Sequence, residues 1–501
     1  MGNILNNTTG FLFNGLKNEK LWIYGISILF LAAHAYYIIN NESLLLLAFP
    51  FMLVMLYLGL FHLNILFFIV AFCIPLSIPL SDLVGGLSID MALPTEPVMF
   101  FMLLIILIKL LKDNGFDKKL LKHPLTVVIL INLAWILITS IFSTMPVVSF
   151  KFFLARLWFI MVFYFLAFQL FKNFKNIDRY FWVYMIPLTI VIFYTVFKQA
   201  GYGVLNQKAA HSAMVPFFND HTSYGAILAM YIPVLFFYVF RHHFNNNFTK
   251  AWAFVLLVIF FIAEILSYSR AAWVSLVVAF MLWILMKLKI RPYVLFTIAG
   301  ILVMVFFAFQ NQIINKLESN QEESSSNIMT HVYSIYNISS DASNVERINR
   351  WASAIKMFEE KPFLGWGPGT YMFQYAPFQL SRNLTIISTN TGDMGNAHSE
   401  YLGPLAESGI LGTLTFVLIV IFSIITGSKI FFRARSNKIK YLALGILLGL
   451  ITYFAHGLLN NFLDTDKASG PFWGFLAVLV ILDVYYKEYS DEALSDVIKK
   501  K

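Results

Sequence analysis

Residues 409–427 have the sequence GILGTLTFVLIVIFSIITG, a run of nineteen residues without a charged side chain. A helix of about 20 apolar residues crosses roughly 30 Å of hydrocarbon. Similar runs recur along this chain of 501 residues, of which 59% are hydrophobic and only 13% are charged, whereas a soluble domain carries roughly a quarter charged residues. Because the runs are continuous and do not alternate, the sequence predicts an all-α, polytopic integral membrane protein and not a membrane β-barrel.

The apolar runs predict about 14 transmembrane helices, with about 12–14 as the range because the second and third runs are joined by a very short connection. The runs are 21–39, 43–60, 62–80, 96–112, 124–143, 150–171, 180–197, 223–240, 251–268, 271–288, 292–309, 409–427, 440–459 and 470–486. The chain is expected to divide into N-terminal membrane helices (1–222), a second group of membrane helices (223–309), one large loop (310–408), and C-terminal membrane helices with a tail (409–501).

The net charge of +9 is explained by membrane topology and needs no nucleic-acid partner. Basic residues fill the connections that fall on one side of a topology with fourteen spans, such as Lys118–Lys119 and Arg433–Arg435, whereas segment 81–95 on the other side contains no lysine or arginine. Excess positive charge marks the cytoplasmic face. We therefore expect both termini in the cytoplasm and the loop 310–408 on the outer side of the membrane.

Within the large loop, SNVERINRWASAIKMFEEKP (343–362) predicts an amphipathic helix. Ser343 and Glu346 have the spacing of a capping box at its start. Arg347 falls on the margin of the apolar face and is placed to turn inward, whereas Arg350 points away from that face and is expected to be solvated.

The helix is followed by KPFLGWGPGTYMF (361–373), in which three alternate residues are glycine. This spacing excludes regular helix and predicts a turn-rich loop held by aromatic side chains. A phosphate-binding loop is disfavoured because no lysine follows in a strand-to-helix context.

Three further polar residues are expected at the outer ends of spans. Arg270 stands between two spans at the start of a helix, where the helix dipole opposes a cation, so an anionic partner is expected. Arg156 lies inside a span and either belongs to a functional site or extends to the outer headgroups. His221, next to Asp220, opens the span 223–240 and either contributes to a site or caps the helix.

The segment NAHSEYLGPLAESGILGT (396–413) leads into the apolar run 409–427. His398 is followed by Ser399, nine residues, Gly409, two residues and Gly412. This spacing resembles the histidine motif of bacterial O-antigen ligases, within the wider superfamily of O-antigen ligases and polymerases. The two glycines are expected to shape the helix start and to pack close to another helix.

Two other elements are similar to those of the same superfamily. SRAAW (269–273) resembles its serine–arginine element after a span, and RINRW (347–351) followed by PFLGWGPGTYMF (362–373) resembles its loop elements. The resemblance covers chiefly residues 220–425, and no element can be placed in the first 200 residues.

The resemblance implies a membrane glycosyltransferase of the cell envelope that acts on a glycan linked to undecaprenyl diphosphate, with a site facing the periplasm. It implies that the catalytic residues are His398, Arg270 and Arg347. Arginines can stabilise the departing diphosphate and neutral His398 can take the acceptor proton, so no metal and no cofactor are expected. The substrate-binding residues expected around them are Arg156, His221, Arg350, Ser399, Glu400, Gly409 and Gly412.

Several alternatives remain open at this level. The acceptor can be lipid A-core, a second glycan, as in a repeat-unit polymerase, or a protein hydroxyl. His398 can act as a general base or as a ligand of the diphosphate, and Glu400 can orient it. A transporter of lipid-linked sugars, which belongs to a different class, would place ionisable residues at mid-membrane, whereas those of this chain gather at the outer edge. His398 and Glu400 alone are too few ligands for a zinc site.

Overall fold

The computed structural model describes residues 22–40, 46, 48–83, 91–112, 115–240, 247–290, 297, 342–379 and 395–500. The chain forms two compact units, Met1–Leu66 and Phe67–Lys501. In the described residues helices dominate, and the only sheet pairs β1 with β2 in antiparallel register, with Ile78 opposite Leu93. The predicted all-α class is therefore confirmed.

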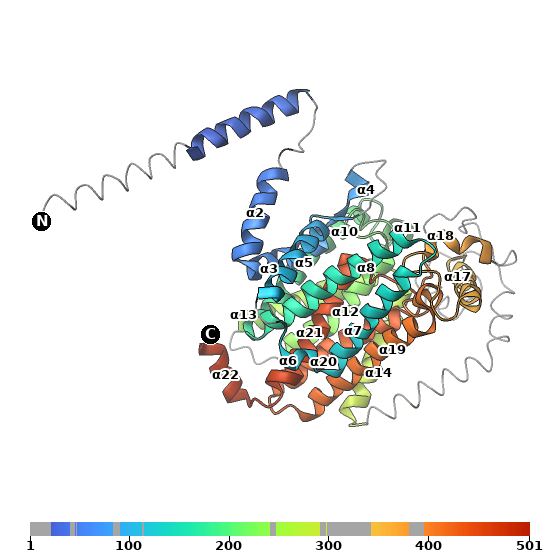
Figure 1. Cartoon of the computed structure of the whole chain (residues 1–501). Coiled ribbons are helices and arrows are strands. Elements are labelled where there is room, and N and C mark those ends of the chain that lie inside the picture. Colours follow the sequence, from blue (N-terminus) through green and yellow to red (C-terminus); the bar gives the residue numbers. More distant parts are fainter. Residues whose placement is uncertain are drawn as a thin grey trace, which may run out of the picture. The chain divides into compact units, whose positions relative to one another are not determined.

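Figure 1 shows the elements along the chain. After a helix at Trp22–Asn40 they are α2 (Ala48–Phe61), α3 (Leu63–Cys73), η2 (Ile74–Leu76), β1 (Ile78–Pro79), α4 (Leu80–Leu83), β2 (Ala92–Leu93), α5 (Thr95–Lys112), α6 (Lys118–Leu121), α7 (Pro124–Ile141), α8 (Pro146–Ile160), η3 (Met161–Leu166), α9 (Ala167–Phe171), α10 (Lys175–Ala200), α11 (Gln207–Ala210), α12 (His221–Phe240), α13 (Asn247–Leu266), α14 (Arg270–Lys287), α17 (Ala342–Glu360), α18 (Tyr371–Gln374), η4 (Ala376–Phe378), α19 (Leu402–Arg433), α20 (Asn437–His456), α21 (Asp466–Ile481), η6 (Leu482–Tyr486) and α22 (Asp491–Lys500).

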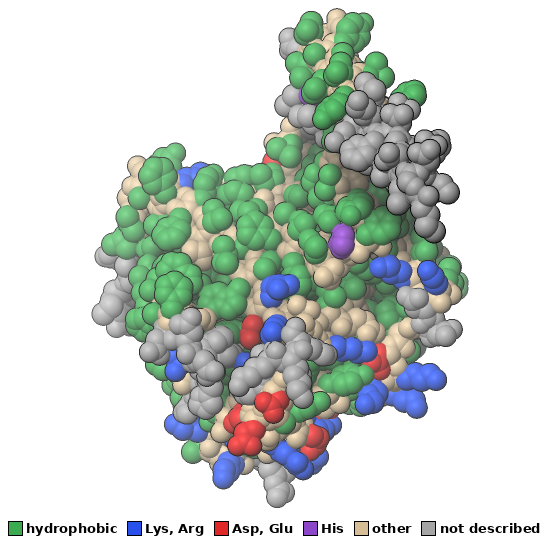
Figure 2. Space-filling view, turned by 90° about the vertical axis from the view of Figure 1, so that its left-hand side faces the viewer, with side chains coloured by type: hydrophobic (Ala, Val, Ile, Leu, Met, Phe, Trp, Pro, Cys, Tyr) green, Lys and Arg blue, Asp and Glu red, His purple; other side chains and the backbone are tan. Residues whose placement is uncertain are grey.

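Ten of the helices among the described residues are long and apolar enough to cross a membrane. They are Trp22–Asn40, Pro124–Ile141, Pro146–Phe171, Lys175–Ala200, His221–Phe240, Phe248–Leu266, Arg270–Lys287, Leu402–Arg433, Asn437–His456 and Asp466–Tyr486. Each overlaps one predicted span. On the face shown in Figure 2, hydrophobic side chains form a wide belt and charged side chains gather below it, as expected of a surface that faces lipid.

The other four predicted spans are not matched by long apolar helices. Runs 43–60 and 62–80 form shorter helices, Phe49–Phe61 and Leu63–Leu76. Run 96–112 forms α5, which carries Glu96, Lys109 and Lys112. Run 292–309 lies outside the described residues except for position 297. The total of fourteen therefore stays a prediction.

The centre of the larger unit is built from α20 and α21, which are buried over most of their length. Helix α12 packs on α20 and α13, while α19 packs on α7 and α20. Close approach of α12 and α20 requires Gly449, because a Cβ there would lie 2.4 Å from the carbonyl oxygen of Met230. Small residues at such crossings are typical of membrane bundles.

The predicted amphipathic helix of the large loop is α17, which packs on α19. It begins at Ala342, one residue before Ser343, and the capping box of Ser343 and Glu346 stays a prediction. The glycine-rich stretch forms the predicted turns, since Gly365, Gly367 and Gly369 all have positive φ angles (69°, 116° and 76°).

Candidate functional site

His398 lies four residues before the start of α19, and its main chain is held on both sides. Its N–H donates to Asn396 Oδ1 at 3.0 Å, and its carbonyl oxygen accepts from Trp351 Nε1 of α17 at 3.3 Å. Its φ of 48° is a left-handed value that few non-glycine residues adopt. Such strained backbone persists only where its surroundings fix it, so the imidazole has a defined position.

The imidazole of His398 is surrounded by cations. Burial is the main cause that lowers its pKa to about 3, and the charges of Arg347 and Arg350 act in the same direction. Asp220 and a hydrogen bond with the Asn460 side chain oppose them. His398 is therefore neutral near pH 7, which is the form that accepts a proton.

Asn460, on the turn after α20, is a neighbour of the His398 ring, since its side chain raises the pKa of that imidazole against the effect of burial. The Asn460 Nδ2 atom is buried without a hydrogen-bond partner among the described residues.

Arg347 projects from α17 toward the turn that follows α20. Its Nε donates to the carbonyl oxygen of Leu459 at 3.2 Å. Its charge acts on His398 and also on His456, the last residue of α20. The inward direction predicted from the amphipathic pattern is thus the one that the structure shows.

Arg270 is the first residue of α14, and His221 is the first residue of α12. The charges of both Arg270 and Arg347 act on the His221 imidazole. That ring stacks on His211, with the ring centroids 4.2 Å apart. His221 is therefore within electrostatic range of both Arg270 and Arg347, and His398 is within range of Arg347, at one end of the bundle.

Several buried polar atoms at this end have no hydrogen-bond partner among the described residues. They are Nδ1 and Nε2 of His456, Nδ1 of His221 and Nδ2 of Asn460. Each such group costs about 1–3 kcal/mol if nothing binds it. We call the group formed by Arg270, Arg347, His221, His398, His456 and Asn460 the basic chamber. Its donors and positive charges suit an anionic ligand with several oxygen acceptors.

Two predicted substrate-binding arginines already have partners. Arg350 is 5% exposed, its Nε pairs with Glu346 Oε1 at 2.7 Å, and its Nη1 donates to Asn396 O at 3.2 Å. The expectation that Arg350 is solvated is therefore wrong. Arg156 pairs with Asp464 at 2.8 Å and does not extend to the headgroups.

Glu400 does not orient His398, contrary to one expectation. Its carboxylate accepts from the Tyr453 hydroxyl at 2.6 Å and from the N–H groups of Phe462 and Leu463 at 2.8 and 2.9 Å. Burial nevertheless raises the pKa of Glu400. Glu400 thus joins the His398 segment to the turn after α20, which carries Asn460, and acts on the histidine only through that turn.

The motif glycines shape the start of the apolar run, as expected, but their close contacts are not with another helix. Gly409 breaks α19 with φ 67° and ψ −168°, and a Cβ there would lie 2.2 Å from the Phe363 carbonyl oxygen of the loop after α17. A Cβ on Gly412 would lie 2.4 Å from the Ser408 Cβ in the same helix. Ser399 Oγ accepts from the N–H groups of Tyr401 and Leu402.

The turn after α20 supplies chamber residues that the sequence did not single out. His456 falls inside predicted span 440–459, and Asn460 follows it. The signal was present as LLNNFLDTD (458–466), a polar cluster between two apolar runs.

The same cluster contains Asp464 and Asp466, a spacing at which two carboxylates can share a cation. Here Asp464 pairs with Arg156, and Asp466 accepts from the hydroxyls of Ser77 and Thr95 at 2.6 Å each. The two carboxylates therefore have separate structural partners.

Comparison with known proteins identifies one part of the chain. A family model described as O-antigen ligase matches residues 254–417. The match runs from α13 to α19 and contains Arg270, Arg347 and His398, but not His456 or Asn460. No curated protein matches the chain.

Proposed function

We propose that this chain, a member of the O-antigen ligase and polymerase superfamily, transfers a glycan from undecaprenyl diphosphate to an acceptor hydroxyl at the basic chamber. Lipid A-core is the acceptor that we propose first. The reaction would occur at the periplasmic face of the inner membrane, because the chamber lies at the helix ends opposite the lysine-rich connections.

The observation that carries this proposal is a set of buried polar atoms without a hydrogen-bond partner, close to two arginines. Arg270 and Arg347 both act on His221, and the ring nitrogens of His456 and Nδ2 of Asn460 have no partner among the described residues. A diphosphate offers several oxygen acceptors and negative charge in one small group. Guanidinium groups bind phosphate oxygens with two parallel hydrogen bonds, so such a ligand would fit both the charge and the missing hydrogen bonds.

The chemistry would proceed by direct displacement. The acceptor oxygen attacks the anomeric carbon while the bond from that carbon to the diphosphate oxygen breaks. The acceptor proton passes to a ring nitrogen of His398, which is neutral near pH 7. Arg270 and Arg347 stabilise the charge that develops on the departing diphosphate, in place of a divalent cation. A single displacement inverts the anomeric centre.

Reconstitution tests the proposal. The purified protein would be incorporated into liposomes with an undecaprenyl diphosphate-linked glycan and, separately, with lipid A-core, free glycan or a protein acceptor. We expect a product on lipid A-core, formed with inversion. A product only on glycan or on protein would instead identify a polymerase or a protein glycosyltransferase within the same superfamily.

Matched variants separate the chamber from the rest of the chain. His398→Ala should abolish transfer, whereas His62→Ala, which changes an exposed histidine of the other compact unit, should not. Full transfer by His398→Ala would overturn the proposed site. Movement of the lipid-linked glycan across the bilayer without any product would overturn the proposed reaction in favour of transport.

A further inference from the structure

Glu264 is an acidic residue buried in apolar surroundings. It lies on the apolar helix α13 and is 1% exposed. Neither of its carboxylate oxygens has a hydrogen-bond partner among the described residues. Ionisable groups inside a membrane span are expensive and mark functional sites, and the proposed glycan transfer makes no use of this one.

Glu264 lines a cavity of about 510 Å³ between α12, α13 and α14. This volume is within the range of small-molecule sites, about 300–1,000 Å³. Glu264 is the only charged residue of the lining, and the walls are rich in aromatic rings, namely Phe236, Phe261, Trp273, Phe280 and Trp283.

The cavity opens on an apolar part of the surface of the bundle. Four apolar side chains of its lining, Phe261, Ile265, Val277 and Phe280, are each about half exposed on the apolar surface of the bundle. A ligand would therefore enter from the membrane and would carry an apolar body.

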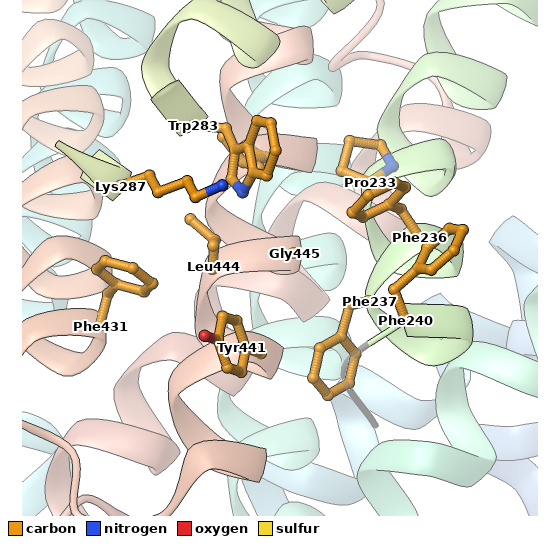
Figure 3. A pocket seen from close by; sticks show the side chains of 11 residues that line it. Pro233, Phe236, Phe237, Phe240, Trp283, Lys287, Phe431, Tyr441, Leu444 and Gly445 are labelled. Atoms are coloured by element: carbon orange, nitrogen blue, oxygen red, sulfur yellow. The ribbon is translucent and has the colours of Figure 1, made fainter. Parts of the chain in front are cut away.

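A neighbouring cavity of about 330 Å³ shows what the shared wall can bind (Figure 3). The two cavities have four lining residues in common, namely Pro233, Phe236, Trp283 and Leu448. In the second one the Lys287 ammonium lies 5.3 Å from the centre of the Trp283 ring. An aromatic side chain of the shared wall thus already holds an ammonium group by a cation–π contact.

Lys287 cannot serve as the partner of Glu264. The Trp273 Nε1 donates to the Glu264 carbonyl oxygen at 3.0 Å, which places Glu264 beside Trp273 near the start of α14. Lys287 ends the same helix, roughly 20 Å farther along at 1.5 Å per residue.

We propose that the cavity binds a lipophilic amine, an apolar chain that carries one ammonium group, with Glu264 as its carboxylate partner. A phosphate headgroup would be repelled by the acid, and an uncharged chain would leave it without a partner. An ammonium group satisfies the carboxylate by an ion pair and contacts the aromatic wall, while the chain fills the apolar remainder.

Equilibrium binding of radiolabelled dodecylamine to the purified full-length protein in detergent micelles tests this site. Dodecanol and dodecyl phosphate, which share the chain but not the charge, serve as competitors. We expect saturable binding of the amine and at least tenfold weaker competition by the alcohol and the phosphate. Equal competition by either one, or no saturable binding of the amine, would overturn the proposal.

Substitutions then assign the binding to this cavity. Glu264→Gln should weaken amine binding at least tenfold, whereas the same change at exposed Glu360 should leave it unchanged. Phe280→Leu removes one ring of the wall but keeps Glu264, and it should weaken amine binding several-fold without affecting dodecanol. Undiminished amine binding by folded Glu264→Gln contradicts the proposal, and if that variant does not fold, the Phe280→Leu result decides.

Discussion

Two polar groups of similar size lie beside the start of α19, and they differ in how their hydrogen bonds are satisfied. The acidic cluster consists of Arg156, Glu400, Glu407 and Asp464. Its carboxylates already accept from the chain, for example Glu407 from the Tyr371 N–H at 3.0 Å. The basic chamber instead contains buried nitrogens that have no hydrogen-bond partner among the described residues. Buried charge alone therefore does not mark a binding site, whereas several unpartnered polar atoms in one place need an explanation, for which we propose a bound ligand.

Two arginines of α17 differ in which of these groups they contact. Arg350 is locked between Glu346 and the Asn396 carbonyl oxygen, and Arg347 reaches the chamber and acts on His398 and His456. The two are three residues apart on one helix. One is expected to maintain the fold and the other to bind the ligand.

The largest expected effect is on folding, at Arg350. Arg350→Leu would leave the buried Glu346 carboxylate without its partner, and such a loss destabilises by about 3–5 kcal/mol. Unfolding of the full-length protein by dodecyl sulfate in mixed micelles measures it. The double variant with Glu346→Leu should recover most of the loss. A single variant as stable as the wild type would show that the ion pair does not hold α17.

The next effect is on catalysis, at Arg347. Arg347→Lys keeps the charge but loses the planar guanidinium, and removal of one donor to a developing oxyanion lowers kcat by about 10²–10³-fold. Stability should stay near that of the wild type, because the lysine keeps the positive charge at this position. The rate of glycan transfer and the dodecyl sulfate midpoint are measured on the same preparation. If Arg347→Lys were unstable but still active, Arg347 would be a residue that maintains the fold and not one that binds the ligand.

A smaller effect is expected on the pH dependence of stability, from protonation of His398. The pKa of His398 is lowered from 6.5 to about 3 in the folded state, mainly by burial. His398 binds a proton more weakly in the folded protein than in the unfolded chain. The free energy of unfolding is therefore highest above pH 6.5, where His398 is neutral in both states, and it decreases as the pH falls toward 3. Between pH 6.5 and 5 we expect about 2 kcal/mol of this loss. His398→Gln should remove that part of the pH dependence, and identical slopes for both proteins would contradict it.

Local patterns in the sequence predicted much of this architecture. The amphipathic spacing of α17 and the alternate glycines after it depend on neighbours in the chain, and both were found. Arg350 was misjudged because one of its partners is Asn396, 46 residues away. Glu400 was misjudged for the same reason, since it accepts from Phe462 and Leu463. His456 was hidden inside an apolar run, where hydropathy does not distinguish a buried histidine from the rest of a span.

The smallest expected effect concerns Ser399, which the motif alone would assign to the ligand. Its hydroxyl accepts from the N–H groups of Tyr401 and Leu402, both at 3.3 Å, at the entry to α19. Ser399→Ala should therefore cost about 1 kcal/mol of stability, as for a lost helix cap, and change the rate of transfer less than about twofold. Because Ser399 adjoins His398, a tenfold lower rate at unchanged stability would assign it to the chamber. Ser399 would then belong to the basic chamber, and the acidic cluster would begin at the next residue, Glu400.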